Sequence, residues 1–447
     1  MRPAGIAILV LAALFMPSRL HAAAADTLDV HTILEQRSTW LDSLLAPEST
    51  RLDTVGTASL ADSLDRGGAA ALRAHAPQTT RAPRRVRTAI RPFQMTTYNR
   101  VDGLRLGSGL GARLPGIGSA TADVAYGFAS HRWQGAALVS LHPFGSGSVD
   151  LRPALELGWS DQVLPFGPNQ GEYFTSLGAL VAGQDRQDYL RQRSADVRAT
   201  VWRTRRASVA LGGFVHDDFS VDASTDFAFM GGGTPIFAVN PTIDAGQTRA
   251  LFIVAEREPL RRVLGGRIEA GIAGGGLGGD FEYSWQHAKL SFAPLMGGSV
   301  VRTSVTGTNT AGSPPVQAVA YLGGDGNLRG YDRLEFAGKR SLVARLDFEW
   351  GRDIFAQTGI PIVRRLQLQF IPHVDVGTTW GDARGVAGNR GNLDGAWRSA
   401  VGLGIRRNTG YPGIASLRAD ISWRTDGAGD NPAVWFRVGN FDFGDDD

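Results

Sequence analysis

From about residue 95 onward, apolar and other residues alternate with a period of two in many short segments. Within 342–350, one face would carry Leu342, Ala344, Leu346, Phe348 and Trp350. The segments 281–286 and 416–423 alternate in the same way. This period is typical of strands whose two faces meet different surroundings. In a soluble sandwich the apolar face would point into the core, whereas in a membrane barrel it would face lipid and the other face would line the lumen. The alternation predicts an all-β protein and leaves both architectures open.

The N-terminus has the composition of a secretory signal peptide, which we assign to residues 1–24. Arg2 precedes an apolar stretch from Ile6 to Met16, and small residues at 22–24 suit cleavage after Ala24. A membrane-spanning helix needs about 20 apolar residues, so this stretch is too short to span. Export, strands of about ten residues, and Trp or Tyr near strand ends favour the barrel over the sandwich.

The candidate strands number sixteen, an even count as bacterial barrels require. They are 103–114, 119–129, 133–142, 148–160, 175–183, 194–204, 207–218, 247–257, 266–275, 280–292, 297–307, 340–350, 365–378, 397–407, 413–423 and 433–443. With both termini in the periplasm, the long gaps at 219–246, 308–339 and 379–396 would be outer loops. Two connections, 161–174 and 351–364, would be unusually long inner turns.

Residues 25–92 differ from the rest and are expected to form a helical or disordered periplasmic segment with a basic linker. Apolar residues recur at helical spacing in 28–46, and 57–75 is rich in Ala. The run 81–87 contains four Arg and a Pro, and no strand pattern is visible before the barrel. We therefore place the barrel domain at 93–447.

One glycine-rich stretch late in the chain combines two adjacent glycines with Leu-Arg-Gly-Tyr. Its motif residues are Gly323, Gly324, Leu328, Arg329, Gly330 and Tyr331. The stretch resembles the signature of the Omp85 superfamily, the outer-membrane barrels of the BamA, TamA and bacterial surface-antigen type. The family usually carries periplasmic POTRA domains, and residues 25–92 look too short and too helical to be one.

The resemblance implies a loop that folds back into the barrel, with Arg329 reaching an acidic residue on the wall. In the family this residue lies in an aromatic-x-Asp-x-Gly motif, and here His373 to Gly377 offers Asp375 and Gly377, with His373 replacing the aromatic residue. Alternation from Leu366, Leu368 and Phe370 places Asp375 on the inner face. Asp347 is a second candidate partner, and Tyr331 is expected to pack against the wall. An unpaired buried Arg would be costly.

The last predicted strand ends in Gly439, Phe441 and Phe443. This pattern resembles the C-terminal assembly signal of outer-membrane proteins. The spacing after Gly439 is one residue short, however, and four residues follow Phe443.

Composition narrows the functional classes. The net charge of +3 gives no reason to expect nucleic acid, and the absence of Cys excludes disulfides and thiolate metal sites. We expect no enzyme activity, cofactor or metal site, and we interpret His216 and its neighbouring Asp217 as an exposed polar strand end.

The resemblance implies insertion or translocation of proteins in the outer membrane of a diderm bacterium. The partners would be outer-membrane lipid and unfolded outer-membrane or secreted proteins, with any periplasmic partner unknown. The alternative is an orphan channel or structural barrel, and a third hypothesis is an outer-membrane hydrolase barrel that would use His216 or Asp217.

Overall fold

The computed structural model describes residues 86–439 except 116, 142–153, 168–175, 177, 182, 184, 186, 205, 230–236, 238, 261–263, 352–367, 384–394, 412–413 and 428–431. The predicted signal peptide, the helices predicted over 28–46 and 57–75, and the aromatic residues Phe441 and Phe443 lie outside these residues. Among the described residues, no helix is long and apolar enough to cross a membrane.

Antiparallel strands make up nearly all of the regular structure. The first ten are β1 (Arg87–Pro92), β2 (Thr97–Asn99), β3 (Gly103–Leu114), β4 (Gly118–Gly127), β5 (Arg132–Leu141), β6 (Ala154–Phe166), β7 (Asp188–Arg203), β8 (Ala207–Ser220), β9 (Gly246–Leu260) and β10 (Leu264–Ala273). The others are β11 (Glu282–Phe292), β12 (Leu295–Met296), β13 (Ser299–Ser313), β14 (Ala320–Leu322), β15 (Phe336–Gly338), β16 (Arg340–Glu349), β17 (Leu368–Trp380), β18 (Arg398–Tyr411), β19 (Ile414–Arg424) and β20 (Ala433–Gly439). Two short 3₁₀ helices are η2 (Gly275–Leu277) and η3 (Val316–Ala318).

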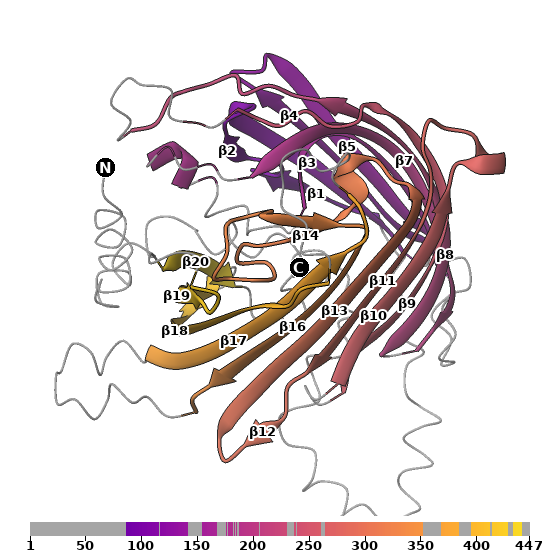
Figure 1. The fold of residues 1–447 in the computed structure, drawn as a ribbon. Coiled ribbons are helices and arrows are strands. Elements are labelled where there is room, and N and C mark those ends of the chain that lie inside the picture. Colours follow the sequence, from indigo (N-terminus) through magenta and orange to yellow (C-terminus); the bar gives the residue numbers. More distant parts are fainter. Residues whose placement is uncertain are drawn as a thin grey trace, which may run out of the picture.

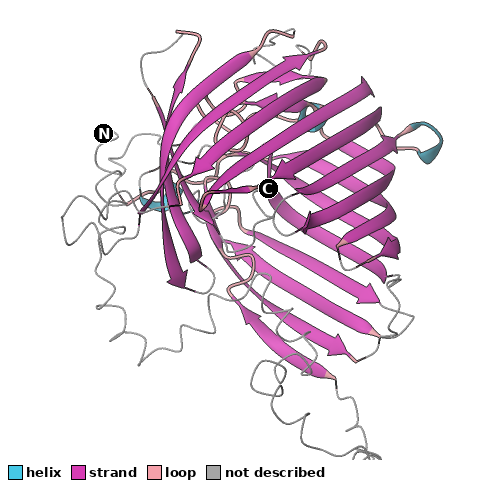
Figure 2. Ribbon diagram, turned by 90° about the horizontal axis from the view of Figure 1, so that it is seen from below, coloured by secondary structure: helices cyan, strands magenta, loops and turns pink. Residues whose placement is uncertain are grey.

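The barrel wall contains sixteen strands, so the predicted fold class and strand count are confirmed. Eighteen strand segments belong to one sheet, and β14 and β15 form a separate pair. Segments β1 and β2 both pair with β3, and segments β11 and β12 both pair with β13. Each of these two pairs of segments counts as one strand, so the eighteen segments form sixteen strands. Figure 1 shows the sheet curving around the 314–339 loop, and Figure 2 shows the same curvature from below.

The strand content differs from the prediction at two places. The described residues 176 and 178–181 are helical, so the predicted strand 175–183 is wrong. The first strand instead begins with β1, inside the segment we had assigned to the linker. Because one predicted strand is lost and one is gained, the number of strands in the wall stays at sixteen. These two changes also move the long 167–187 connection to the rim that carries the other long loops. The other long inner connection, between β16 and β17, stays at the opposite end of the wall.

The apolar face points outward from the wall, as predicted, at 342–350 and 416–423. Leu346 and Trp423 are about two-fifths exposed, whereas Asp347 and Asp420 are buried inside. At 281–286 the prediction is wrong, because the strand register places Tyr283 on the same face as Gly312 and on the inner side of the wall. Outward positions there carry polar residues instead.

The two ends of the sheet do not pair with each other in the part of the chain that the structure describes. Strand β20 forms a ladder with β19, and β1 and β2 form ladders with β3. No ladder joins β20 to β1 or β2 among the described strands. Figure 1 shows the last strands (yellow) turning toward the inside of the curve. In the described part of the chain, the sheet is therefore open between its first and last strands, and we call this opening the seam.

Candidate functional site: a buried ion-pair latch

The loop between β13 and β16 enters the barrel and turns sharply there. Gly323 and Gly324 have φ of +111° and +97°, a region that residues with a Cβ rarely adopt. The Asn327 side chain accepts a hydrogen bond from Gly323 N at 2.9 Å and donates to Tyr321 O at 2.8 Å. The two glycines and this amide together fix the bend that points Arg329 at the wall.

Arg329 is fully buried and contacts both carboxylates that we had proposed as its partners. Its Nε and Nη2 donate to the two oxygens of Asp375 at 2.7 and 2.6 Å, and its backbone N donates to Asp375 Oδ2 at 3.0 Å. Nη2 also donates to Asp347 Oδ1 at 2.7 Å. A guanidinium held by two carboxylates is the arrangement that makes burial of this charge tolerable. We call this contact the latch.

The latch belongs to a larger buried network in which four guanidinium groups face four carboxylates. Its members are Arg329, Arg345, Arg418 and Arg437, with Asp325, Asp347, Asp375 and Asp420. The charges balance, four against four. Burial raises the pKa of the Asp325 carboxyl, while the neighbouring Arg437 and Arg345 act in the opposite direction. Loss of any one charge would leave this network with one unbalanced charge.

Glycine permits the close approach of loop and wall at two positions. A Cβ on Gly330 would lie 2.6 Å from Ala400 Cβ and 3.1 Å from the Trp423 carbonyl oxygen. A Cβ on Gly377 would lie 3.3 Å from Leu322 of the loop. The motif glycine and the glycine after Asp375 therefore make room for the same inserted loop.

Tyr331 packs inside the barrel as predicted. The residue is 1% exposed, and its hydroxyl donates to Ser399 O at 3.1 Å. The Arg424 guanidinium lies over the ring, 4.3 Å from its centroid. Phe336 contacts the ring edge-on at 5.5 Å between centroids. Polar and aromatic contacts thus hold the end of the motif against the last strands.

The last strand contacts the latch directly, a feature that the sequence did not lead us to expect. Trp435 Nε1 donates to the backbone oxygen of Arg329 at 2.6 Å. Arg437 pairs with Asp420 at 3.1 Å and with Asp325 at 3.4 Å. Gly439, part of the predicted C-terminal signal, ends this strand opposite Ser416. The position of β20 is therefore tied to the inserted loop.

Alternation alone could have revealed several members of the network. Arg418 and Asp420 alternate with Ile421 and Trp423 in one strand, so both had been expected to face the lumen. Nothing in the sequence indicated which of the lumen-facing charges would meet.

His373, which replaces the aromatic residue of the family motif, shares a hydrogen bond with Ser422 Oγ at 2.8 Å. Gly402 leaves room for its ring, because a Cβ there would lie 2.3 Å from Nε2.

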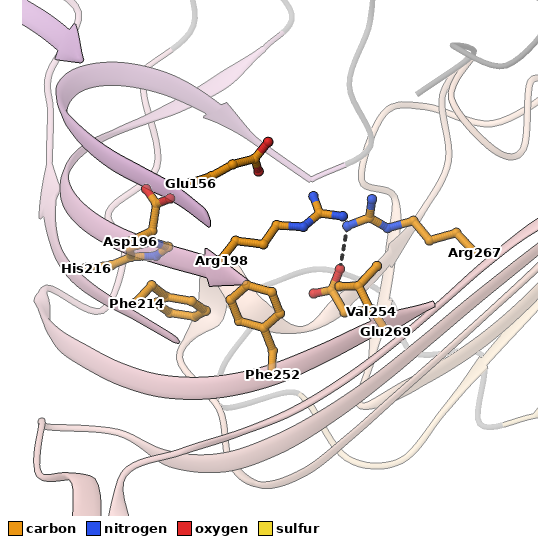
Figure 3. Close-up of a pocket in the computed structure, with 9 residues that line it drawn as sticks. All are labelled: Glu156, Asp196, Arg198, Phe214, His216, Phe252, Val254, Arg267 and Glu269. Carbon is orange, nitrogen blue, oxygen red and sulfur yellow. Dashed lines mark hydrogen bonds and ion pairs between the residues drawn. The ribbon is translucent and has the colours of Figure 1, made fainter. Parts of the chain in front are cut away.

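A shallow pocket lies on the inner face of β6 to β10, away from the latch strands (Figure 3). It encloses about 320 Å³ and combines aromatic rings with charged groups, among them Glu156, Asp196 and Arg198. His216 lines this pocket and stacks on Phe214 at 3.9 Å between centroids, so the prediction of an exposed strand end for His216 is wrong. No group of three or more potential metal ligands occurs among the described residues.

Comparison with known proteins identifies the fold. No family model and no curated protein matches the sequence. BamA from Haemophilus ducreyi, in a structure lacking POTRA domains 1–3, superposes with a TM-score of 0.51 and 14% identity. The match covers 78% of this chain and 69% of that one. CdiB from Acinetobacter baumannii matches with a TM-score of 0.40 and 12% identity, over 78% of this chain and 58% of CdiB. With its sixteen-stranded antiparallel meander, this chain has the fold of a BamA-type outer-membrane β-barrel.

Proposed function

We propose that the protein inserts other proteins into the outer membrane, or translocates them across it. The observation that carries the proposal is the combination of a seam with a latch that holds the last strand. Strand edges without a partner present backbone donors and acceptors that can pair with an incoming strand. The latch would keep the last strand attached to the inserted loop while the pairing of strand edges at the seam changes.

The apolar outer face supports a position within a lipid bilayer. Outward residues such as Leu211, Ile268 and Val401 are between about two-fifths and three-fifths exposed, in a chain whose inner face carries the buried charges. Such a surface would be an aggregation hazard in water and is expected in lipid. The partners would then be outer-membrane lipid and unfolded barrel or secreted proteins.

Reconstitution would test this proposal. The purified protein would be incorporated into liposomes, and a small urea-unfolded outer-membrane barrel would be added as the client. We expect the client to fold faster than in protein-free liposomes, as scored by its heat-modifiable migration. Liposomes carrying an unrelated barrel at the same density provide the control. Equal folding rates in both samples would contradict the proposal.

An orphan channel or structural barrel remains the alternative that the resemblance leaves open. A channel requires a continuous water-filled path, whereas here the 314–339 loop occupies the lumen and Arg333 bonds to Phe166 O across it at 2.7 Å. This contact supports the insertion proposal over the channel. Steady conductance in a planar bilayer, together with no effect on the client, would favour the channel.

A further inference from the structure

The first strand has a free edge whose backbone groups at the loop end face away from β3. Tyr98 pairs with Leu104 across the β2–β3 ladder. The Leu104 oxygen accepts from Phe128 N at 2.9 Å, on the side of β4. Because Leu104 directs its backbone polar groups toward β4, its partner Tyr98 directs its own toward the seam. Arg100, two residues further along, continues the same edge.

Two loops of the same chain satisfy these edge groups. Ser176 Oγ accepts from Tyr98 N at 3.2 Å, and Asp185 Oδ2 accepts from Arg100 N at 2.8 Å. The Arg100 oxygen accepts from Ser224 N at 2.8 Å and from Thr225 N at 3.2 Å. We call these four residues, Ser176, Asp185, Ser224 and Thr225, the edge cover. Three backbone groups that a neighbouring strand would bind are therefore already occupied.

Side chains hold the edge cover in place. The Tyr98 ring packs with Ala179 and Phe237 in a buried cluster, and its hydroxyl donates to Phe227 O at 2.5 Å. The Arg100 guanidinium is 1% exposed and donates to Asp185 O and Asn240 Oδ1, each at 3.0 Å. Such burial and bonding indicate a specific docked arrangement of both loops on the strand.

We propose that the edge cover is an autoinhibitory contact, which must leave Tyr98 and Arg100 before the loop end of the first strand can pair with another strand. This inference rests on the proposed insertion or translocation function. It restricts strand addition in the resting protein to the β1 part of the edge. Opening of the seam then requires a movement of the two loops as well as of the last strand.

Hydrogen exchange tests the contact without reference to function. Ser176→Ala removes the acceptor of Tyr98 N, and the exchange of this amide is expected to rise about tenfold, as for loss of one hydrogen bond. Ser160→Ala is the matched control, since Ser160 Oγ bonds to Ser194 Oγ at 2.8 Å inside the wall. It should leave Tyr98 unchanged. Unchanged exchange at Tyr98 in Ser176→Ala would overturn the proposal.

A disulfide lock tests the consequence, and the natural chain has no Cys to interfere. The Oγ atoms of Thr97 and Ser176 are in hydrogen-bond contact, so Thr97→Cys with Ser176→Cys should form a disulfide when oxidised. In the liposome assay, oxidation should lower the rate of client folding toward the protein-free rate, and reduction should restore it. Ser160→Cys with Ser194→Cys is the control lock and should have no effect.

The outcomes separate the two proposals. If the wild-type protein accelerates client folding and the oxidised Thr97→Cys, Ser176→Cys variant does so equally, the proposal that the edge cover is autoinhibitory is wrong and the proposed function stands. If the wild-type protein has no effect on the client, the proposed function is wrong, and the exchange at Tyr98 alone decides whether the cover occupies the edge.

Discussion

Arg329 and Asp375, 46 residues apart in the sequence, form a bidentate ion pair in which both side chains are fully buried. We expect Arg329→Ala and Asp375→Ala each to destabilise the barrel by about 3–5 kcal/mol, because each removes the shortest ion pair of the remaining buried charge and unbalances the network. The double variant should lose less than the sum of the two. Unfolding in urea, followed by heat-modifiable migration, would measure this.

The exposed Arg132→Ala is the control for the latch variants and should be near wild type. Stability equal to wild type in both single variants would show that the Arg329–Asp375 ion pair does not stabilise the barrel.

Gly330 lies too close to the wall for a side chain. Gly330→Ala should cost about 1–3 kcal/mol, since its Cβ would lie 2.6 Å from Ala400 Cβ. Gly276→Ala is the matched control, because no atom lies within 4 Å of its Cβ position. The same urea titration would compare them, and equal midpoints would contradict the close approach.

Trp435 should restrain the last strand through its bond to Arg329 O. Trp435→Phe keeps an aromatic ring and removes the Nε1 donor, so we expect a loss of about 1 kcal/mol. Backbone exchange in 433–439 should rise correspondingly. Trp423→Phe, on the outward face and 39% exposed, should leave that segment unchanged. If both variants exchange alike, Trp435 does not connect the strand to the latch.

The barrel itself makes a simple prediction in detergent. A barrel wall whose neighbouring strands are hydrogen-bonded resists unfolding by mild detergent, so the unheated protein should migrate faster than the boiled protein in a gel. Identical migration of the two samples would argue strongly against a membrane barrel.

Alternation predicted the inward direction of Asp347 and Asp375, because one face of each strand is apolar and the register fixes the rest. It failed for Tyr283 and Trp285, which lie on the inner face, where the Trp285 ring covers Gly271, while polar residues of the same strand face outward. It also missed β1, whose inward Arg91 is compensated by Asp123 at 3.0 Å, a partner distant in sequence. The short apolar run at 178–181 fits a strand or a helical turn equally well, and local pattern cannot decide between them.

The contacts of Trp435 and of Ser176 could not have been predicted from the sequence. Both join a side chain to a backbone atom of a remote segment, and a backbone atom carries no sequence signal. Only the folded arrangement of the last strand and of the loops brings these groups together.

Quantitative proteomics of the outer membrane after depletion of this protein tests the central claim most directly. Depletion should lower the abundance of several other barrels or of secreted proteins, and wild-type protein supplied in trans should restore them. The Arg329→Ala variant, at matched expression, should restore them less well. An unchanged profile after full depletion would contradict a role in insertion or translocation.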